Sequence, residues 1–454
     1  MKVTHLTLTN YRGFQQLDIE FRGNITILAG VNGSGKSAVL RALSTVLSHL
    51  LPKISPSKQT PEAFTGTDVH SDKPALTISA TFEDSNKTLR GQITHASPSQ
   101  GKAKEYAKRR DQARFAIRTT TKGSKEENAL RDEIQFLSEL LEGGKDHFSF
   151  QTQPLKKGGL ASGTTGKALH PVAVLYATSR YLGRMPPRLS GLRPFEPANA
   201  YAGALVGNEV SLGAFASWFQ AALKGALGSK AVSKTLLRQL DSVISTILPG
   251  FSDPRLTETS PPKFYVKKDR NEFELNQLSD GERGLLALAF DLTRRLAIAN
   301  PELKDPVAKS PAIVLLDEVE LHLHPSWQRD VLRRLARTFS HCQFIITTHS
   351  PQVLGEVEGK YIHYLKRNKK GAIIRWTPPR ALGLDSNRVL RELMDAPSRN
   401  VTFDARAHKL FKLIDAERFR DAKALMSKIQ GKLGADEPDV VRARALIAFL
   451  KGKK

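Results

Sequence analysis

The residues best suited to chemistry lie near the N-terminus, where a glycine-rich segment follows an apolar run and precedes a helical pattern. Residues 30–37 read Gly-Val-Asn-Gly-Ser-Gly-Lys-Ser, and the apolar run occupies residues 25–29. The spacing G-x-x-x-x-G-K-S lets successive backbone N–H groups and a helix N-terminus face one anion. Lys36 would reach the β- and γ-phosphates of ATP, and Ser37 would bind Mg²⁺. The sequence therefore predicts a phosphate cradle that includes Asn32, Gly33, Ser34, Gly35, Lys36 and Ser37.

Two further apolar runs end in polar side chains that could act on a bound nucleotide. Residues 312–316 are followed by Asp317 and Glu318, and residues 343–348 are followed by His349. Ligands of parallel sheets bind at the carboxyl ends of the strands, so these side chains should meet at the cradle. We expect Asp317 to hold Mg²⁺, Glu318 to orient the attacking water and His349 to contact the γ-phosphate. A surface turn that carries two acids is the alternative for Asp317 and Glu318.

A second helix start could also bind phosphate. Leu278-Ser279-Asp280-Gly281-Glu282 opens a helical pattern that continues to Ala299, and Ser279 is suited to cap it. Ser279, Gly281 and Glu282 are candidates for nucleotide binding, with an ordinary helix cap as the alternative. Because this helix should start in a separate lobe, we expect its first turn to close over the nucleotide of a two-fold-related copy. The sequence thus predicts a homodimer, or a higher homo-oligomer, that forms around ATP.

Composition narrows the class of protein. Lys and Arg number 69 against 45 acidic residues, a formal net charge of +24, and 40% of the residues are hydrophobic. Such an excess attracts phosphate polymers, so we expect a nucleic-acid partner, DNA or RNA, with a merely basic surface as the alternative. Cys342 is the only cysteine, and we expect it to be a small buried residue. No run approaches the roughly 18 apolar residues that span a bilayer, so we expect a cytoplasmic protein without a membrane partner.

The order of these motifs resembles the ATP-binding-cassette superfamily, in particular its soluble branch of RecF, SMC and OLD-type ATPases. Asn10-Tyr11-Arg12-Gly13-Phe14 is similar to an element of that branch, and the resemblance implies that Arg12 lies near the nucleotide. Residues 320–325, Glu-Leu-His-Leu-His-Pro, resemble the segment that follows the catalytic glutamate. A metal site at His322 and His324 is therefore the less favoured reading. The resemblance implies ATP and Mg²⁺ as cofactors.

The expected architecture combines this resemblance with the hydrophobic pattern of the chain. Residues 3–9 and 17–21 alternate as strands do, whereas residues 212–248 have helical spacing. We expect an α/β fold: an ABC-type P-loop ATPase head with a mixed sheet, an inserted helical lobe and a helical C-terminal tail. The expected boundaries are 1–378 for the head, with an insertion at 52–170 and a helical lobe at 205–250, and 379–454 for the helical C-terminal region.

The sequence leaves two assignments undecided: which glutamine is a ligand, and what Arg180 does. The family uses a glutamine as a ligand of magnesium and water, and Gln151 and Gln153 are both candidates. Arg180, in the segment Tyr176-Ala177-Thr178-Ser179-Arg180-Tyr181, could touch phosphate or pair with an acid.

The C-terminal part resembles the stand-alone PtuA-type ATPases of the Septu system and the related ATPases of retrons, which serve bacterial anti-phage defence. This resemblance implies a separate HNH-type endonuclease partner. Residues 355–454 lack the D-x-D pair of OLD-type nucleases, so we expect no nuclease domain on this chain. We expect an ATP-hydrolysing switch that controls a partner nuclease. A RecF- or SMC-like repair ATPase that acts directly on DNA is the alternative, and a non-enzymatic scaffold is the third hypothesis.

Overall fold

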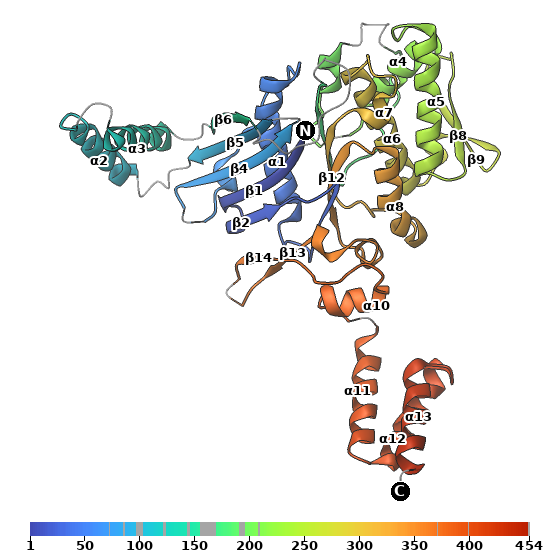
Figure 1. Cartoon of the computed structure of the whole chain (residues 1–454). Helices are drawn as coiled ribbons and strands as arrows, with labels where there is room; N and C mark the ends of the chain where they lie inside the picture. The colour runs from blue at the N-terminus through green and yellow to red at the C-terminus, as the bar shows by residue number, and fades with distance from the viewer. Residues whose placement is uncertain are drawn as a thin grey trace. The chain divides into compact units, whose positions relative to one another are not determined.

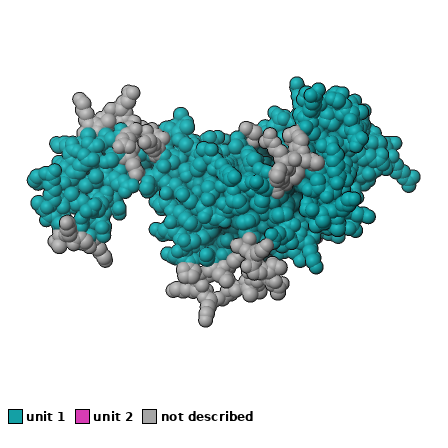
Figure 2. Space-filling view, turned by 90° about the horizontal axis from the view of Figure 1, so that it is seen from above, with its two compact units in different colours: residues 1–382 teal, residues 383–454 magenta. Residues whose placement is uncertain are grey.

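The computed structural model divides into two compact units, residues 1–382 and residues 383–454, and Figure 2 colours the first of them teal. The structure describes residues 1–452 except 72, 85–86, 97–102, 121–123, 143–145, 155–168, 190–195, 208, 370 and 398. No helix in these described ranges is long and apolar enough to cross a membrane.

A six-stranded mixed sheet forms the centre of the first unit (Figure 1). Its order is β14-β13-β3-β12-β11-β7, and all neighbours are parallel except β13 and β14, which are antiparallel. Strands β11 and β12 are buried at every residue, which explains their continuous apolar sequences. The strands are β3 (Ile25–Gly30), β7 (Val172–Tyr176), β11 (Ala312–Leu316), β12 (Cys342–Thr348), β13 (Ile362–Arg367) and β14 (Ile373–Trp376).

A second sheet of five strands is antiparallel throughout, in the order β2-β1-β4-β5-β6. Helix α1 (Lys36–Ile54) is buried on nearly all sides, because it contacts strands of both sheets. Two helices that contact each other, α2 (Ala103–Ala116) and α3 (Lys125–Glu142), are inserted between β5 and β6. The strands are β1 (Lys2–Tyr11), β2 (Phe14–Glu20), β4 (Ala75–Asp84), β5 (Lys87–Ala96) and β6 (Asp146–Pro154).

Helices form a further layer around α6 (Asp280–Ala299), which contacts β7, α4, α5 and α7 (Figure 1). Phe215 of α4 stacks on Phe290 of α6 with ring centroids 4.1 Å apart, and Phe264 packs beside both. A small antiparallel sheet, β10-β9-β8, lies in the chain between α5 and α6. The elements are α4 (Leu212–Leu223), α5 (Lys230–Ile247), β8 (Phe251–Leu256), β9 (Phe264–Lys268), β10 (Asn271–Glu274), α7 (Pro306–Lys309), α8 (Pro325–Thr338) and α9 (Pro351–Leu354).

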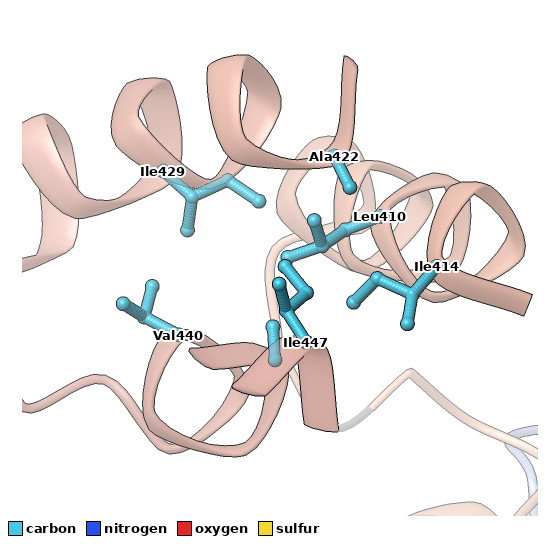
Figure 3. Packing of buried hydrophobic residues seen from close by; sticks show 7 residues of the cluster. Leu410, Ile414, Ala422, Ile429, Val440 and Ile447 are labelled. Carbon is cyan, nitrogen blue, oxygen red and sulfur yellow. The ribbon is translucent and has the colours of Figure 1, made fainter. Parts of the chain in front are cut away.

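The second unit has its own hydrophobic core, shown in Figure 3. Its main helices are α11 (Val401–Asp415), α12 (Phe419–Leu433) and α13 (Pro438–Gly452), preceded by the short α10 (Ser386–Arg388). Asn400 caps α11 by accepting two backbone N–H groups. The core consists of Leu410, Ile414, Ala422, Ile429, Val440, Ala443 and Ile447.

The expected α/β fold with a mixed sheet, helical lobe and helical C-terminal region is confirmed. The helix predicted to open at residues 278–282 and to continue to Ala299 is α6, which begins at Asp280 with Ser279 as its N-cap. Cys342 is buried at the start of β12, as expected, and burial raises the pKa of its thiol to about 12.

Candidate functional site

The glycine-rich segment forms a tight turn between β3 and α1, and two of its glycines are required by close contacts. Gly30 has a φ of +147°, and a Cβ there would lie 2.3 Å from the carbonyl oxygen of Leu365. Gly35 has a φ of +92°, and its Cβ would lie 2.4 Å from the ring of Phe14. A side chain at either position would therefore force the turn open, which explains the glycines of the motif.

Lys36 and Ser37 occupy the first turn of α1 at the mouth of the turn. The Lys36 ammonium donates to the carbonyl of Gly30 at 3.0 Å and to that of Val31 at 3.2 Å. Burial lowers the pKa of Lys36, and the acids of the site oppose that shift. The Ser37 hydroxyl donates to the Asp317 carboxylate at 3.1 Å, so the two expected magnesium ligands are in direct contact.

This donor set fits a bound nucleotide with Mg²⁺. A hydroxyl and a carboxylate are oxygen ligands of the kind that Mg²⁺ takes alongside phosphates and water. Ser34 is buried, and its hydroxyl has no partner among the described residues. An acceptor brought into the turn would satisfy that hydroxyl, so the residues present match the expected ligand.

Glu318 follows β11 in a left-handed backbone conformation, with a φ of +47°. Its N–H donates to the Thr347 hydroxyl at 2.7 Å, and the same hydroxyl donates to the Asp317 carboxylate at 2.5 Å. A non-glycine residue in this conformation costs on the order of 1–3 kcal/mol unless neighbours hold it there. Thr347 therefore helps to orient both acids, a role that the sequence did not reveal.

His349 is the residue directly after β12, and β12 lies between β3 and β11 in the sheet. Burial lowers the pKa of His349, and the nearby Lys36 ammonium lowers it further. Its backbone N–H donates to the Glu320 carboxylate, which also accepts from the Thr348 hydroxyl at 2.8 Å. Glu320 thus fixes the end of β12, a second role that sequence reasoning missed.

One cavity of about 500 Å³ joins the cradle to the catalytic candidates. Arg12 borders it, and its side chain donates to Asp68 at 2.8 Å. Arg367 and Ile373, from β13 and the start of β14, border it as well and were not singled out in the sequence. The predicted residues that line it are Arg12, Asn32, Gly33, Gly35, Lys36, Ser37, Glu318 and His349.

Ser279, Gly281 and Glu282 line a different, smaller cavity of about 150 Å³. The Ser279 hydroxyl accepts the N–H of Glu282, and the Glu282 carboxylate accepts the N–H of Ser279, so the two form a capping box. Glu282 also pairs with Lys268 at 2.7 Å, so its part in nucleotide binding stays a prediction. The structure therefore does not bring the predicted second phosphate-binding segment to the cradle cavity of the same chain.

The remaining candidates lie as follows. Gln151 and Gln153 are exposed on β6, at the edge of the five-stranded sheet, and neither lines the cradle cavity. His324 caps α8 by accepting the N–H of Ser326. The described part of the chain holds no cluster of three or more His, Cys, Asp or Glu side chains suited to a metal, which leaves the His322 and His324 metal reading without support.

Among the described residues, the Arg180 side chain contacts backbone carbonyl groups and forms no ion pair with an acid. Its guanidinium donates to the carbonyls of Asp317, Glu318 and Val319. Burial lowers its pKa to about 10.

Relatives of the chain are known. It is similar to the retron Ec83 probable ATPase of Escherichia coli, with 33% identity over 218 residues that cover 47% of this chain and 39% of the relative. It is also 33% identical to the Septu protein PtuA of Bacillus mycoides over 137 residues, 29% of this chain and 19% of that protein. These relatives confirm the expected resemblance to retron and Septu ATPases. The chain spans well under half the length of either relative.

A solved SMC head domain from Thermotoga maritima is also similar to the chain. It has 17% identity and a TM-score of 0.41, and the match covers 83% of this chain and 99% of the SMC chain. The family model of the RecF/RecN/SMC N-terminal domain matches residues 2–371. Because that match extends over most of the sequence, the chain belongs to the RecF/RecN/SMC N-terminal domain family.

Proposed function

We propose that the chain binds ATP with Mg²⁺ and hydrolyses ATP to ADP and phosphate. The observation that carries the proposal is the meeting of three strand ends at one cavity, with Lys36, Glu318 and His349 around it. Direct contact between Ser37 and Asp317 supports the assignment of both to Mg²⁺. The family match and the names of the relatives point to the same activity.

Each side chain of the site has a defined task in this proposal. Lys36 supplies positive charge to the β- and γ-phosphates, and bound Mg²⁺ would neutralise further charge on their oxygens. Glu318 accepts a hydrogen bond, and then a proton, from the attacking water. His349 stays neutral near pH 7, because its pKa is lowered, and a neutral ring can donate one N–H to the γ-phosphate.

We propose that two copies close around two ATP molecules. Ser279 and Gly281 start α6, where backbone N–H groups and the helix dipole favour an anion. They line a cavity other than the one at the cradle of their own chain. A second copy would bring the Ser279 segment to the γ-phosphate, and hydrolysis would then reopen the dimer.

In biological terms, we propose a switch that controls a separate nuclease of the HNH type in anti-phage defence. The proposal is supported by similarity to the retron Ec83 probable ATPase and to Septu protein PtuA. Residues 1–378 would form the ATPase head, and residues 379–454 a separate helical region. A RecF- or SMC-like ATPase that acts on DNA directly is the second candidate, supported by the family match and the net charge of +24.

Substitution of the proposed base tests the activity. Glu318→Gln keeps the size of the side chain but removes its basicity, so turnover should fall by about 10²-fold or more while ATP binding persists. Lys36→Ala is the matched variant that should lose binding of a fluorescent ATP analogue. Unchanged turnover in Glu318→Gln would refute the role of Glu318.

Purification from the native host separates the two biological candidates. A nuclease that copurifies in a fixed ratio would support the defence switch. Strong stimulation of ATP hydrolysis by DNA, without any copurifying protein, would support the repair ATPase instead.

A further inference from the structure

We infer that Arg180 is a positioning residue for ATP hydrolysis, because it holds the backbone turn that carries Glu318. The inference rests on the proposed function, in which Glu318 accepts the proton of the attacking water. Arg180 would act through the direction in which the Glu318 side chain leaves the backbone, without lining the cradle cavity of its own chain.

The sheet brings Arg180 to this turn. Strand β7 is the parallel neighbour of β11, with Tyr176 opposite Leu316, and the N–H of Asp317 donates to the Tyr176 carbonyl at 2.8 Å. The chain after each strand therefore emerges at the same sheet edge. Arg180 lies in the turn after β7 and reaches the turn that follows β11.

The guanidinium contacts three consecutive carbonyl groups. One nitrogen donates to Asp317 O at 2.5 Å, and the other donates to Glu318 O at 2.6 Å and to Val319 O at 3.3 Å. Only 8% of Arg180 is exposed, so these bonds are shielded from water. A planar fork with several fixed donors can join neighbouring carbonyls in this way, whereas a lysine ammonium offers one point charge on a flexible stem.

Glu318 is therefore held from two sides. On the β12 side, its N–H donates to the Thr347 hydroxyl, and the N–H of Val319 donates to the Thr347 carbonyl at 3.2 Å. On the β7 side, Arg180 donates to the Asp317 and Glu318 carbonyls of the same two peptides. Because the φ of Glu318 is +47°, the turn would relax toward a commoner conformation if one side were released.

Other roles for Arg180 have less support. The residue does not line the cradle cavity, and among the described residues its side chain forms no ion pair. It lines a separate cavity of about 280 Å³ instead, together with Asp280 and Gly284 of α6. Of the two roles considered for this residue from sequence, pairing with an acid is not observed among the described residues, and the position of Arg180 outside the cradle cavity gives no support to phosphate contact within its own chain.

Arg180→Lys tests the inference by separating turnover from binding. A misplacement of about 1 Å can cost about 10² in rate, so kcat should fall about 10- to 100-fold. KM and the affinity for a fluorescent ATP analogue should change less than about 3-fold, because the cradle is untouched. Arg295→Lys is the control: Arg295 is similarly buried and donates to the carbonyls of Ala200 and Ala202 and to the Asp291 carboxylate, without contact to the Glu318 turn. It should leave kcat within about 2-fold in assays run well below its Tm.

The same substitution in a Glu318→Gln background decides between positioning and general damage. If Arg180 acts through Glu318, Arg180→Lys should change the residual turnover of Glu318→Gln less than about 3-fold. An equal loss in both backgrounds, or an unchanged kcat in Arg180→Lys alone, would overturn the inference. Wild-type turnover in Glu318→Gln would instead refute the proposed function, so the two failures are distinguishable.

Arg180→Gln is a second variant that tests the same inference if Arg180→Lys does not fold. Arg180→Gln shortens the side chain by two bonds, so its amide cannot join the carbonyls that the guanidinium contacts. It should show the same kcat loss with unchanged nucleotide affinity. Guanidinium at millimolar concentration should restore part of the kcat of Arg180→Gln through the cavity beside α6, and not that of Glu318→Gln. A folded Arg180→Gln protein with wild-type kcat would overturn the inference.

Discussion

Thr347→Val isolates the hydroxyl group that joins the two acids of the site. Thr347 is fully buried in β12, and its hydroxyl accepts the N–H of Glu318 and donates to the carboxylate of Asp317. Valine has nearly the same shape, so the substitution removes the two hydrogen bonds without leaving a large cavity. We expect a less stable protein with slower ATP hydrolysis.

The magnitude follows from the groups that lose their partners. A buried N–H without an acceptor costs about 1–3 kcal/mol, and a hydrogen bond to a charged group contributes about 1.5–3 kcal/mol. Asp317 keeps the Ser37 hydroxyl as a donor, so we expect a total loss of about 3 kcal/mol in the free energy of unfolding. Unfolding of residues 1–382 as one unit has an entropy of roughly 0.8 kcal/mol/K, so the Tm should fall by roughly 4 °C.

The neighbouring strand offers a matched control. Thr26 of β3 is equally buried, and among the described residues its hydroxyl has no hydrogen-bond partner. Thr26→Val should therefore leave the Tm unchanged or raise it, because it buries a methyl in place of an unpaired hydroxyl. Differential scanning calorimetry of both variants gives the comparison. Equal Tm values for Thr347→Val and Thr26→Val would show that the hydrogen bonds of the Thr347 hydroxyl do not stabilise the fold.

Two further predictions concern other parts of the first unit. His363 donates to the carbonyl of Glu20, and burial, with repulsion from Arg375, lowers its pKa to about 4 from the ordinary 6.5. The unfolded chain thus takes up this proton first as pH falls, so stability should decrease by on the order of 2–3 kcal/mol between pH 6.5 and 4 and level off below. His363→Gln should flatten the profile of Tm against pH in that window; an unchanged slope would contradict this. Gly281→Ala would place a Cβ 2.3 Å from the carbonyl oxygen of His322, so the Tm should fall by an amount that corresponds to about 1–3 kcal/mol while affinity for a fluorescent ATP analogue persists. A Tm equal to that of the wild type would show that the first turn of α6 is loosely packed.

The strand ends of the site could be predicted because each is marked by neighbouring residues in the sequence, an apolar run directly before a functional residue. The apolar runs before Gly30, Asp317 and His349 correspond to β3, β11 and β12, and these strands are neighbours in the sheet. The helix cap at Ser279 could be predicted for the same reason, since a capping box is contained within four consecutive residues.

The supporting contacts could not be predicted because they depend on strand order and register. Thr347 reaches Asp317 only because Leu316 lies opposite Ile346, and Arg180 reaches Glu318 only because Leu316 also lies opposite Tyr176. The two hydroxyls in Thr347-Thr348 were the one available signal, since polar residues are costly in a fully buried strand. The choice between Gln151 and Gln153 stays open.

We propose that ATP joins two copies through the cradle of one and the Ser279 segment of the other. Light scattering on the Glu318→Gln variant, with and without ATP and Mg²⁺, measures this directly, because slow hydrolysis preserves the bound state. We expect ATP to double the molar mass, and we expect addition of Ser279→Arg to abolish the doubling while a fluorescent ATP analogue still binds. A molar mass that stays the same when ATP is bound would rule out the ATP-bound dimer.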